Sequence, residues 1–505
     1  MIGLKTPSKT EINEVDSAVS EYCIAILMED EIGLGSEEKY VLIQVLLNFG
    51  LAVPVDKTVK EVVRLFGISE AVYKRSRDLL ISKGGLEGCQ ISIKGKGRAR
   101  KGVILSPIYL EKLGTLASQT KCDGSEVANK SLIPDLLQSD GYWRQSGFDS
   151  KLAELASGTA HKNRPGVAST ELKLRPPTRI LMCVLLAHSD LTGVVCGLGH
   201  ADLRKLTGMK RDRLVSHLSK LTQIGFLKAS FAGLTGGRLF GVTKGEYLIN
   251  LEWCGFKVKT LPAITSIFIP PSWGAGFSNE ANGIYKQAKC IGVIPSSDIE
   301  DVPVRGVIPW GNGAIPFIPL FKDVPDLTKY FLDSNELQIE EMLQWKLEQC
   351  ASELLNKYWQ RLHPNDNVVT DTILSEIASD LLPAKYTDLE ETVGYLSPID
   401  NAELVRFIYS IAHRIAFYVK SKLTDLNRYL KGTGLNIHDM QHILLPKYVD
   451  RDLMSFCLIS YPKKVRAKET CVVLLEGHES KFRNKFTFIS DVEDIPDAIR
   501  DKYKL

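Results

Sequence analysis

The 505-residue chain lacks the short motifs that mark the commonest classes of enzyme. It contains no Gly-x-x-x-x-Gly-Lys-Ser/Thr phosphate loop, no Gly-x-Ser-x-Gly nucleophile elbow and no dinucleotide-binding glycine fingerprint after a predicted strand. Adjacent carboxylates such as Glu340-Glu341 and Glu390-Glu391 occur in an acidic helical region, where solvent-exposed surface is their expected role. The sequence therefore predicts a protein that is not an enzyme and has no cofactor.

Paired cysteines and long hydrophobic runs are also missing. The ten cysteines include no Cys-x-x-Cys pair, which argues against a zinc ribbon and against a thioredoxin-like motif. Several lie in apolar runs, as Cys183 does within residues 180–186, and such positions are typical of reduced core cysteines. The N-terminus has no hydrophobic signal region, and no apolar run approaches the length of a membrane span. We expect a cytoplasmic protein that makes no membrane contact.

One pair of histidines has the spacing of a zinc site. In His438-Asp-Met-Gln-His442, a helix would place the two imidazoles one turn apart. Metalloproteases have glutamate where this chain has Asp439, whose shorter side chain would not place a general base equally well. His413, on a preceding predicted helix, is the only candidate for a third ligand that we find. We therefore expect ordinary polar helix residues and no metal.

Length and composition indicate several ordinary folded domains. A chain of 505 residues exceeds what one hydrophobic core usually serves, so we expect three or four domains. The hydrophobic fraction of 44% and the charged fraction of 24% are typical of soluble globular proteins.

The net charge of +3 conceals an uneven distribution of charge. From Lys57 to Lys101, twelve Lys or Arg residues face four acids, and from Gly199 to Glu246 nine face three. From Asp323 to Glu403 the balance reverses, with five Lys or Arg residues against seventeen acids. The two basic regions suit nucleic-acid contact, and the acidic region should face away from nucleic acid.

The second basic region has the pattern of two crossed helices. A short helix over Ala201 to Leu206 is predicted to stop at Gly208, where a tight turn requires a positive φ. A second helix follows at once and ends at Gly225. It places three leucines at helical spacing on one face: Leu214, Leu218 and Leu221. The other face is polar and basic.

A predicted hairpin follows this helix pair. Residues 226–231 have the composition of a strand. We predict a turn over Gly233 to Arg238 and a returning strand over Leu239 to Thr243. The whole stretch resembles winged helix-turn-helix DNA-binding domains. The resemblance implies DNA contacts from six residues: Lys210, Arg211, Arg213, Ser216, Lys220 and Arg238.

The first basic region repeats this pattern. Ser36 is predicted to cap a first helix, a second helix spans Thr58 to Phe66, and a third begins at Ser69. The interval from Gly67 to Gly84 equals that from Gly208 to Gly225, which marks two variants of one unit. Arg77 falls where the second copy has Leu218, so the predicted packing residues of the third helix are Val72, Leu79 and Leu80, with Tyr73 partly buried.

A basic hairpin completes the first copy. Two short strands, residues 90–94 and 102–106, flank a loop rich in Lys and Arg that could lie along phosphates or enter the minor groove. The candidate DNA-binding residues of this copy are Ser69, Lys74, Arg75 and Arg77 on the helix, and Lys96, Arg98, Arg100 and Lys101 on the wing.

These observations predict a mainly α fold with α+β elements. The expected divisions are an N-terminal extension (1–35), winged-helix domain 1 (36–113), a linker (114–171), winged-helix domain 2 (172–251), an irregular segment rich in proline and aromatic residues (252–325), a helical domain (326–446) and a small α+β unit (447–505).

The expected function is binding of double-stranded DNA through two winged helices, with transcriptional regulation in a bacterium or mobile element as the favoured use. The layout is also similar to plasmid- or phage-type replication initiators, some of which pair two winged helices. A third alternative is a scaffold whose winged helices bind proteins. The C-terminal half would serve self-association or contact with a protein partner.

Overall fold

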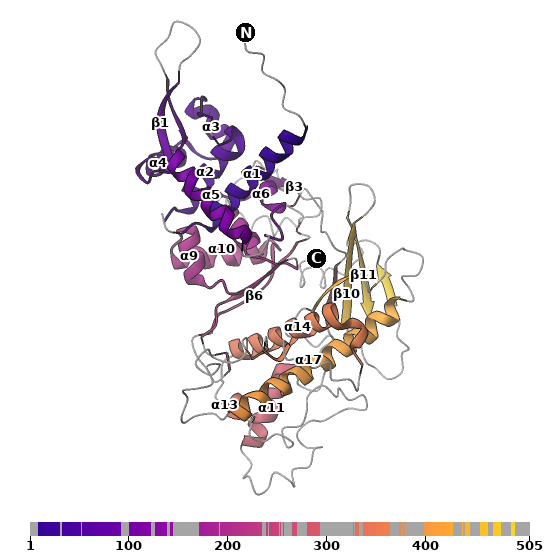
Figure 1. Cartoon of the computed structure of the whole chain (residues 1–505). Helices are drawn as coiled ribbons and strands as arrows, with labels where there is room; N and C mark the ends of the chain where they lie inside the picture. Colours follow the sequence, from indigo (N-terminus) through magenta and orange to yellow (C-terminus); the bar gives the residue numbers. More distant parts are fainter. Residues whose placement is uncertain are drawn as a thin grey trace, which may run out of the picture. The chain divides into compact units, whose positions relative to one another are not determined.

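Helices account for most of the secondary structure in the computed structural model of the chain (Figure 1), as the sequence predicts. The chain divides into two units. Unit 1 comprises Met1–Ser230 and Gly245–Val258, and unit 2 comprises Phe231–Lys244 and Lys259–Leu505.

The structure describes residues 9–30, 33–51, 53–91, 100–122, 127–138, 142–144, 171–190, 192–234, 239–240, 242–251, 253, 256, 265–269, 280–292, 327, 329–332, 337–363, 373–375, 377–378, 398–427, 437, 440–444, 455–462, 468–475 and 486–489.

Unit 1 contains one order of elements twice. Repeat 1 (residues 36–105) consists of α2 (Ser36–Phe49), α3 (Val59–Phe66), α4 (Glu70–Ser82), β1 (Leu86–Ile91) and β2 (Arg100–Leu105). Repeat 2 (residues 176–249) consists of α8 (Pro176–Ala187), β5 (Val194–Val195), α9 (His200–Thr207), α10 (Arg211–Gln223), β6 (Leu227–Phe231) and β7 (Glu246–Ile249).

The strands of the two repeats are ordered alike. In repeat 2 the sheet order is β5-β7-β6, so the last strand lies in the middle. In repeat 1, β1 and β2 form an antiparallel pair, and Val55, between α2 and α3, makes an antiparallel bridge to Val103 of β2. Both repeats therefore have the order α–β–α–α–β–β with the same strand neighbours.

Glycines occupy the same turns in both repeats. Gly67 and Gly208 follow the second helices with φ of 65° and 64°, and Gly84 and Gly225 follow the third helices with φ of 75° and 73°. The equal spacing in the sequence thus reflects equal backbone turns, which confirms the prediction made for these positions.

Two helices of repeat 1 begin one residue after their predicted starts, which serve as N-caps, and the one predicted cap is wrong. Thr58 caps α3 in a capping box with Glu61, and the Ser69 hydroxyl accepts a hydrogen bond from the Val72 amide at 3.3 Å. The predicted cap at Ser36 is wrong, because Gly35 is the N-cap of α2 and Ser36 lies buried in the first turn.

The packing faces of the third helices correspond, although the residue types differ. On α10, the predicted stripe of Leu214, Leu218 and Leu221 is buried. On α4, the buried residues are Tyr73, Ser76 and Leu80. The prediction for Leu79 is wrong, because its side chain is 40% exposed, and Val72 is only half-buried. Tyr73 and Leu80 occupy the places of Leu214 and Leu221, and Arg77, in the place of Leu218, is half-buried.

The two repeats share one hydrophobic core with three further helices. These are α1 (Lys9–Met28), α5 (Pro107–Cys122) and α6 (Leu132–Gln138). Buried residues of α1, α6 and both repeats belong to a single cluster. Residues 114–171, expected to be a linker, therefore contribute the end of α5 and all of α6 to a core. The apolar stretch of α6 is too short to stand out within a polar composition, and tertiary packing decides its structure.

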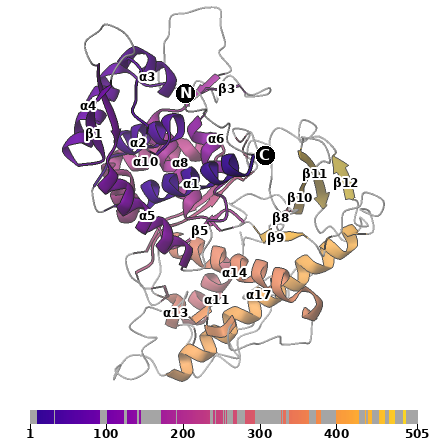
Figure 2. The same cartoon turned by 45° about the horizontal axis from the view of Figure 1, so that its top comes forward.

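A buried arginine ties α8 of repeat 2 to repeat 1 and α6, which lie together in Figure 2. Arg179 donates hydrogen bonds to the carbonyl oxygens of Leu136 at 2.7 Å and Leu137 at 2.6 Å, and to the hydroxyl of Tyr40 at 2.6 Å. The Tyr40 hydroxyl in turn donates to the Phe66 carbonyl at 2.9 Å. Every element in this chain of hydrogen bonds is thereby fixed relative to the others.

Unit 2 combines helices with a five-stranded sheet. Its helices include α11 (Glu280–Gly292), α13 (Lys329–Leu332), α14 (Leu337–Tyr358) and α17 (Pro398–Asn427). The sheet order is β12-β11-β10-β8-β9, with β8 (Thr265–Ile269), β9 (Gln441–Leu444), β10 (Ser455–Pro462), β11 (Lys468–Leu475) and β12 (Phe486–Ile489). The β8–β9 pair is parallel and the other pairs are antiparallel.

This sheet crosses the divisions expected from the sequence. The segment 252–325, expected to be irregular, contributes β8 and α11, and β8 lies between β10 and β9 in the sheet. The last three strands therefore do not form a separate unit of residues 447–505. The residue pattern of a strand does not identify a partner that is distant in sequence, which explains the difference.

The helices of unit 2 enclose two carboxyl groups. Gln344 donates hydrogen bonds to Glu280 at 2.8 Å and to Glu348 at 3.0 Å, and all three side chains are buried. Burial raises the pKa of Glu348 well above its usual range, and the charge of Glu280 adds to this effect.

We predict that Glu348→Gln removes a pH dependence from the stability of unit 2. A carboxyl whose native pKa is raised binds its proton more tightly when folded, so the wild-type free energy of unfolding should fall as pH rises from about 4.5 through the native pKa. The amide mimics the protonated acid, so the variant should be flatter and more stable at pH 8. Urea unfolding at pH 5, 6.5 and 8 measures this, with the less buried Glu353→Gln on the same helix as the control. Parallel pH profiles for wild type and Glu348→Gln would contradict it.

We predict that Gly208→Ala destabilises unit 1 more than Gly84→Ala. Both glycines have positive φ, which costs about 1 kcal/mol or more for alanine. A Cβ at Gly84 would meet nothing within 4 Å, whereas one at Gly208 would lie 2.7 Å from the Gly35 Cα. We expect an excess loss of about 1–3 kcal/mol for Gly208→Ala in urea unfolding. Equal losses would show that the contact with Gly35 relaxes without cost.

We predict that Arg179→Met lowers the free energy of unfolding by about 3 kcal/mol or more, because it leaves the buried carbonyls of Leu136 and Leu137 without these donors. Arg175→Met, at an exposed position one turn earlier, should change stability by less than about 0.5 kcal/mol. Chemical denaturation of the two variants makes the comparison. A loss for Arg179→Met no larger than that of the control would contradict the role of this hydrogen-bond network.

Candidate nucleic-acid interface

Helix α10 leaves its predicted basic residues accessible while its leucine stripe is packed. Leu214, Leu218 and Leu221 are buried. Lys210 is the N-cap residue, Arg211, Arg213 and Ser216 are exposed and Lys220 is half-buried, while the exposed Asp212 lies between the two arginines. The exposed start of α10 thus carries more basic than acidic residues, and it can approach a polyanion while the core face of the helix remains packed.

Helix α4 uses several of its predicted DNA-binding residues in local contacts. The Ser69 hydroxyl caps the helix, as described above, and Lys74 forms an ion pair with Glu70 at 2.6 Å. Arg77 pairs with Asp78 at 2.7 Å, and its guanidinium lies 6.0 Å from the centre of the Tyr73 ring. These contacts reduce the free cationic character of α4 relative to α10.

The predicted wings are described only in part. Lys101 is exposed on β2, and Arg100 is the first residue of that strand. Lys96, Arg98 and Arg238 lie outside the described residues.

The second wing differs from the prediction in its returning strand, which is β7 and not residues 239–243. Leu234 and Thr243 exchange two backbone hydrogen bonds of 3.0 Å each, before β7 begins at Glu246. Residues 231–244 belong to unit 2, where the ring of Phe231 stacks on Trp345 with centroids 4.5 Å apart.

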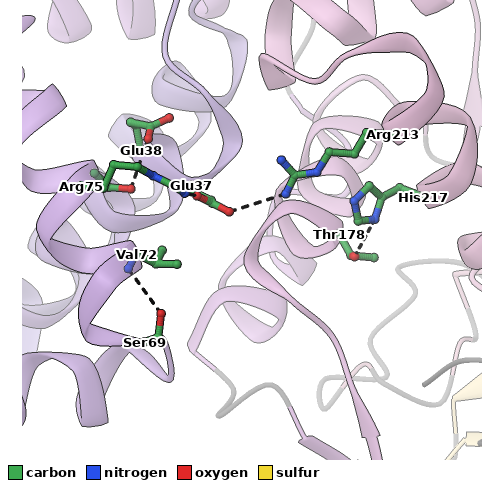
Figure 3. A network of polar contacts seen from close by, with 9 residues as sticks. Glu37, Glu38, Ser69, Val72, Arg75, Thr178, Arg213 and His217 are labelled. Carbon is green, nitrogen blue, oxygen red and sulfur yellow. Dashed lines mark hydrogen bonds and ion pairs between the residues drawn. The ribbon is translucent and has the colours of Figure 1, made fainter. Parts of the chain in front are cut away.

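A single carboxylate joins α4 and α10 (Figure 3). Glu37, in the first turn of α2, forms an ion pair with the Arg75 guanidinium on α4. Its other carboxylate oxygen lies 3.6 Å from the Arg213 guanidinium on α10. The side chain of Glu37 is 18% exposed, whereas those of Arg75 and Arg213 are 60% and 50% exposed.

The start of α2 is held in place by its other side chains. Glu38 is buried and accepts a hydrogen bond from the Ser76 hydroxyl of α4 at 3.2 Å. The buried Lys39 ammonium donates to the carbonyl oxygens of Leu27, at 3.2 Å, and Glu29 at the end of α1. The carboxylate of Glu37 is therefore presented from a fixed turn.

A second cationic cluster lies along α10 and includes residues that the sequence did not single out. His217 shares a hydrogen bond of 2.9 Å with the Thr178 hydroxyl of α8. Burial, followed by the charges of Arg213, Lys220 and Arg175, lowers the pKa of His217 to about 4. Burial and the charge of Arg175 also lower the pKa of Lys220. At neutral pH the imidazole is uncharged among these cations.

Sequence reasoning missed Arg175 and His217. Arg175 precedes Pro176 and Pro177, so it is the N-cap residue of α8, but only the fold brings that helix start beside α10. His217 is one turn after Arg213, and this spacing is the only sequence signal for its place in the cluster.

His442, one of the two histidines considered as a metal site, is not on a helix. His442 lies on β9, where it is buried and stacks on Trp359 with ring centroids 5.0 Å apart. A strand does not place residues four apart on one helical face, so the zinc spacing has no structural basis here. His438 and Asp439 lie outside the described residues. No group of three or more potential metal ligands occurs among the residues that the structure describes.

Comparison of the chain with protein-family models, with curated proteins and with solved structures finds no match. Within the described ranges, no helix combines the length and apolar character that crossing a membrane requires.

Proposed function

We propose that repeats 1 and 2 are winged-helix domains that bind double-stranded DNA, with α10 as the principal helix in the major groove. The observation that carries this proposal is the group of exposed basic residues at the start of α10 (Lys210, Arg211 and Arg213), which follows a glycine turn in a repeated α–β–α–α–β–β arrangement. Cations on a rigid helix neutralise phosphates, and side chains at the start of such a helix reach base edges.

We propose transcriptional regulation as the use of this DNA binding. A second candidate, replication initiation, is favoured by one observation: both repeats share a single core, so one protomer would present two helices in a fixed relation to adjacent groove segments. A genome-wide binding map separates the two. Sites at promoters support regulation, and direct repeats beside an origin support initiation. A chain that binds proteins but no DNA probe would instead be a scaffold.

We predict that replacing Arg211 and Arg213 together with alanine weakens binding of the full chain to a duplex about 10- to 100-fold, because two cationic contacts are lost. The slope of log K against log salt should become shallower by up to about 1.8, at 0.9 for each lost phosphate contact. Fluorescence anisotropy at several salt concentrations measures both quantities.

The matched control is Arg406→Ala with Arg414→Ala, which makes the same charge change at exposed positions of α17 in unit 2. This control should retain wild-type affinity and slope. Absence of DNA binding by the unaltered chain at low salt would reject the proposed function, as would equal effects of the two double substitutions. Circular dichroism and urea unfolding establish that each variant remains folded.

A further inference from the structure

Two arginines from different repeats converge on one anionic group. Arg75 comes from α4 and Arg213 from α10, and both reach the carboxylate of Glu37. Because one carboxylate contacts both guanidinium groups, those groups lie close enough together for a single small anion to span them. A DNA phosphodiester, like a carboxylate, shares one negative charge between two oxygens, and arginine binds such pairs of oxygens well.

The exposure of the three side chains leaves room for such an anion. The carboxylate of Glu37 is mostly covered, at 18% exposed, while at least half of each arginine side chain is accessible. An approaching phosphate would therefore meet the guanidinium groups first and the carboxylate only behind them.

The separation of the two arginines is set by packing and does not depend on Glu37 alone. Gly208, in the turn before α10, lies so close to Gly35 that a Cβ there would be 2.7 Å from the Gly35 Cα. Glu38 and Lys39 hold the start of α2 against α4 and α1. The two guanidinium groups should therefore remain neighbours when the ion pairs to Glu37 break.

We propose that Glu37 is an internal counter-ion of the free protein, and that one DNA backbone phosphate takes its place and bridges Arg75 and Arg213 in the complex. This inference rests on the proposed function. It adds that the two repeats bind one continuous duplex together. They share a phosphate contact where they meet, and neither binds DNA independently there. It also makes Glu37 a residue that lowers affinity, because its negative charge competes with the phosphate for both arginines.

A double-substitution cycle on the full chain tests the shared phosphate. Arg75→Gln and Arg213→Gln are each expected to weaken binding to a duplex about five-fold, from the loss of about 1 kcal/mol per contact. The double variant should lose about 5- to 10-fold rather than the 25-fold expected of independent contacts. Its salt slope should fall by about 0.9, corresponding to one phosphate.

The matched pair is Arg75→Gln with Arg211→Gln, since Arg211 is on the same helix as Arg213 and carries the same charge. These two losses should multiply, and the salt slope should fall by about 1.8, corresponding to two phosphates. Multiplicative losses for Arg75 and Arg213, with a slope change as large as that of the matched pair, would overturn the inference.

The variant Glu37→Gln tests the counter-ion role of Glu37. Removing the competing charge should raise affinity for duplex DNA about three- to ten-fold, on the scale of one or two surface ion pairs. The control Glu111→Gln, at an exposed position on α5, should change affinity less than about two-fold. In the Arg75→Gln, Arg213→Gln background, most of the gain from Glu37→Gln should disappear.

The outcomes separate the inference from the proposed function. Failure of the unaltered chain to bind duplex DNA would overturn both. Binding that is sensitive to Arg211 but unaffected by Glu37→Gln would leave the proposed function standing and overturn the counter-ion role. Urea unfolding of Glu37→Gln confirms that the variant is folded before its affinity is interpreted.

Discussion

The arrangement of the two repeats depends on the hydrogen bonds made by the buried guanidinium group of Arg179. A charge removed from water requires several hydrogen bonds in return, and Arg179 finds them at two carbonyls of α6 and at the Tyr40 hydroxyl. Tyr40 belongs to the first helix of repeat 1, and Arg179 to the first helix of repeat 2. Because each donor of the guanidinium has a fixed direction, the two helices can pack together in few ways. The common core around them makes unit 1 one body.

The electrostatics of the proposed interface follow from that packing. Once α2 lies against α8, the start of α2 reaches both third helices, and Glu37 meets a cation from each. The start of α8 similarly brings Arg175 to Lys220 and His217, where burial and like charge keep the imidazole neutral at physiological pH. The surface along α10 therefore combines cations that are free to bind an anion with cations already paired inside the protein.

Several features of the fold were predictable because their causes are local. The positive φ at Gly67 and Gly208, and the buried face of Leu214, Leu218 and Leu221, follow from backbone sterics and helical periodicity. Leu79 shows the limit of this reasoning. Several apolar residues on α4 could form a stripe, and only the shape of the neighbouring core selects Tyr73 and Leu80 while leaving Leu79 partly exposed. His442 also could not be placed from local sequence, because its strand β9 is formed by pairing with the distant strand β8.

The sequence by itself determined the twofold repetition, the positions of the turns, and which face of α10 is buried, because the turns and the buried face depend on neighbours within a few positions along the chain. Tertiary structure alone decided that α6 belongs to the core, that β8 joins strands near the C-terminus, and that Glu37 lies between Arg75 and Arg213. These are contacts between segments far apart in sequence. Their energy comes from buried surface and from hydrogen bonds that form only in the folded chain, so no local sequence pattern predicts them.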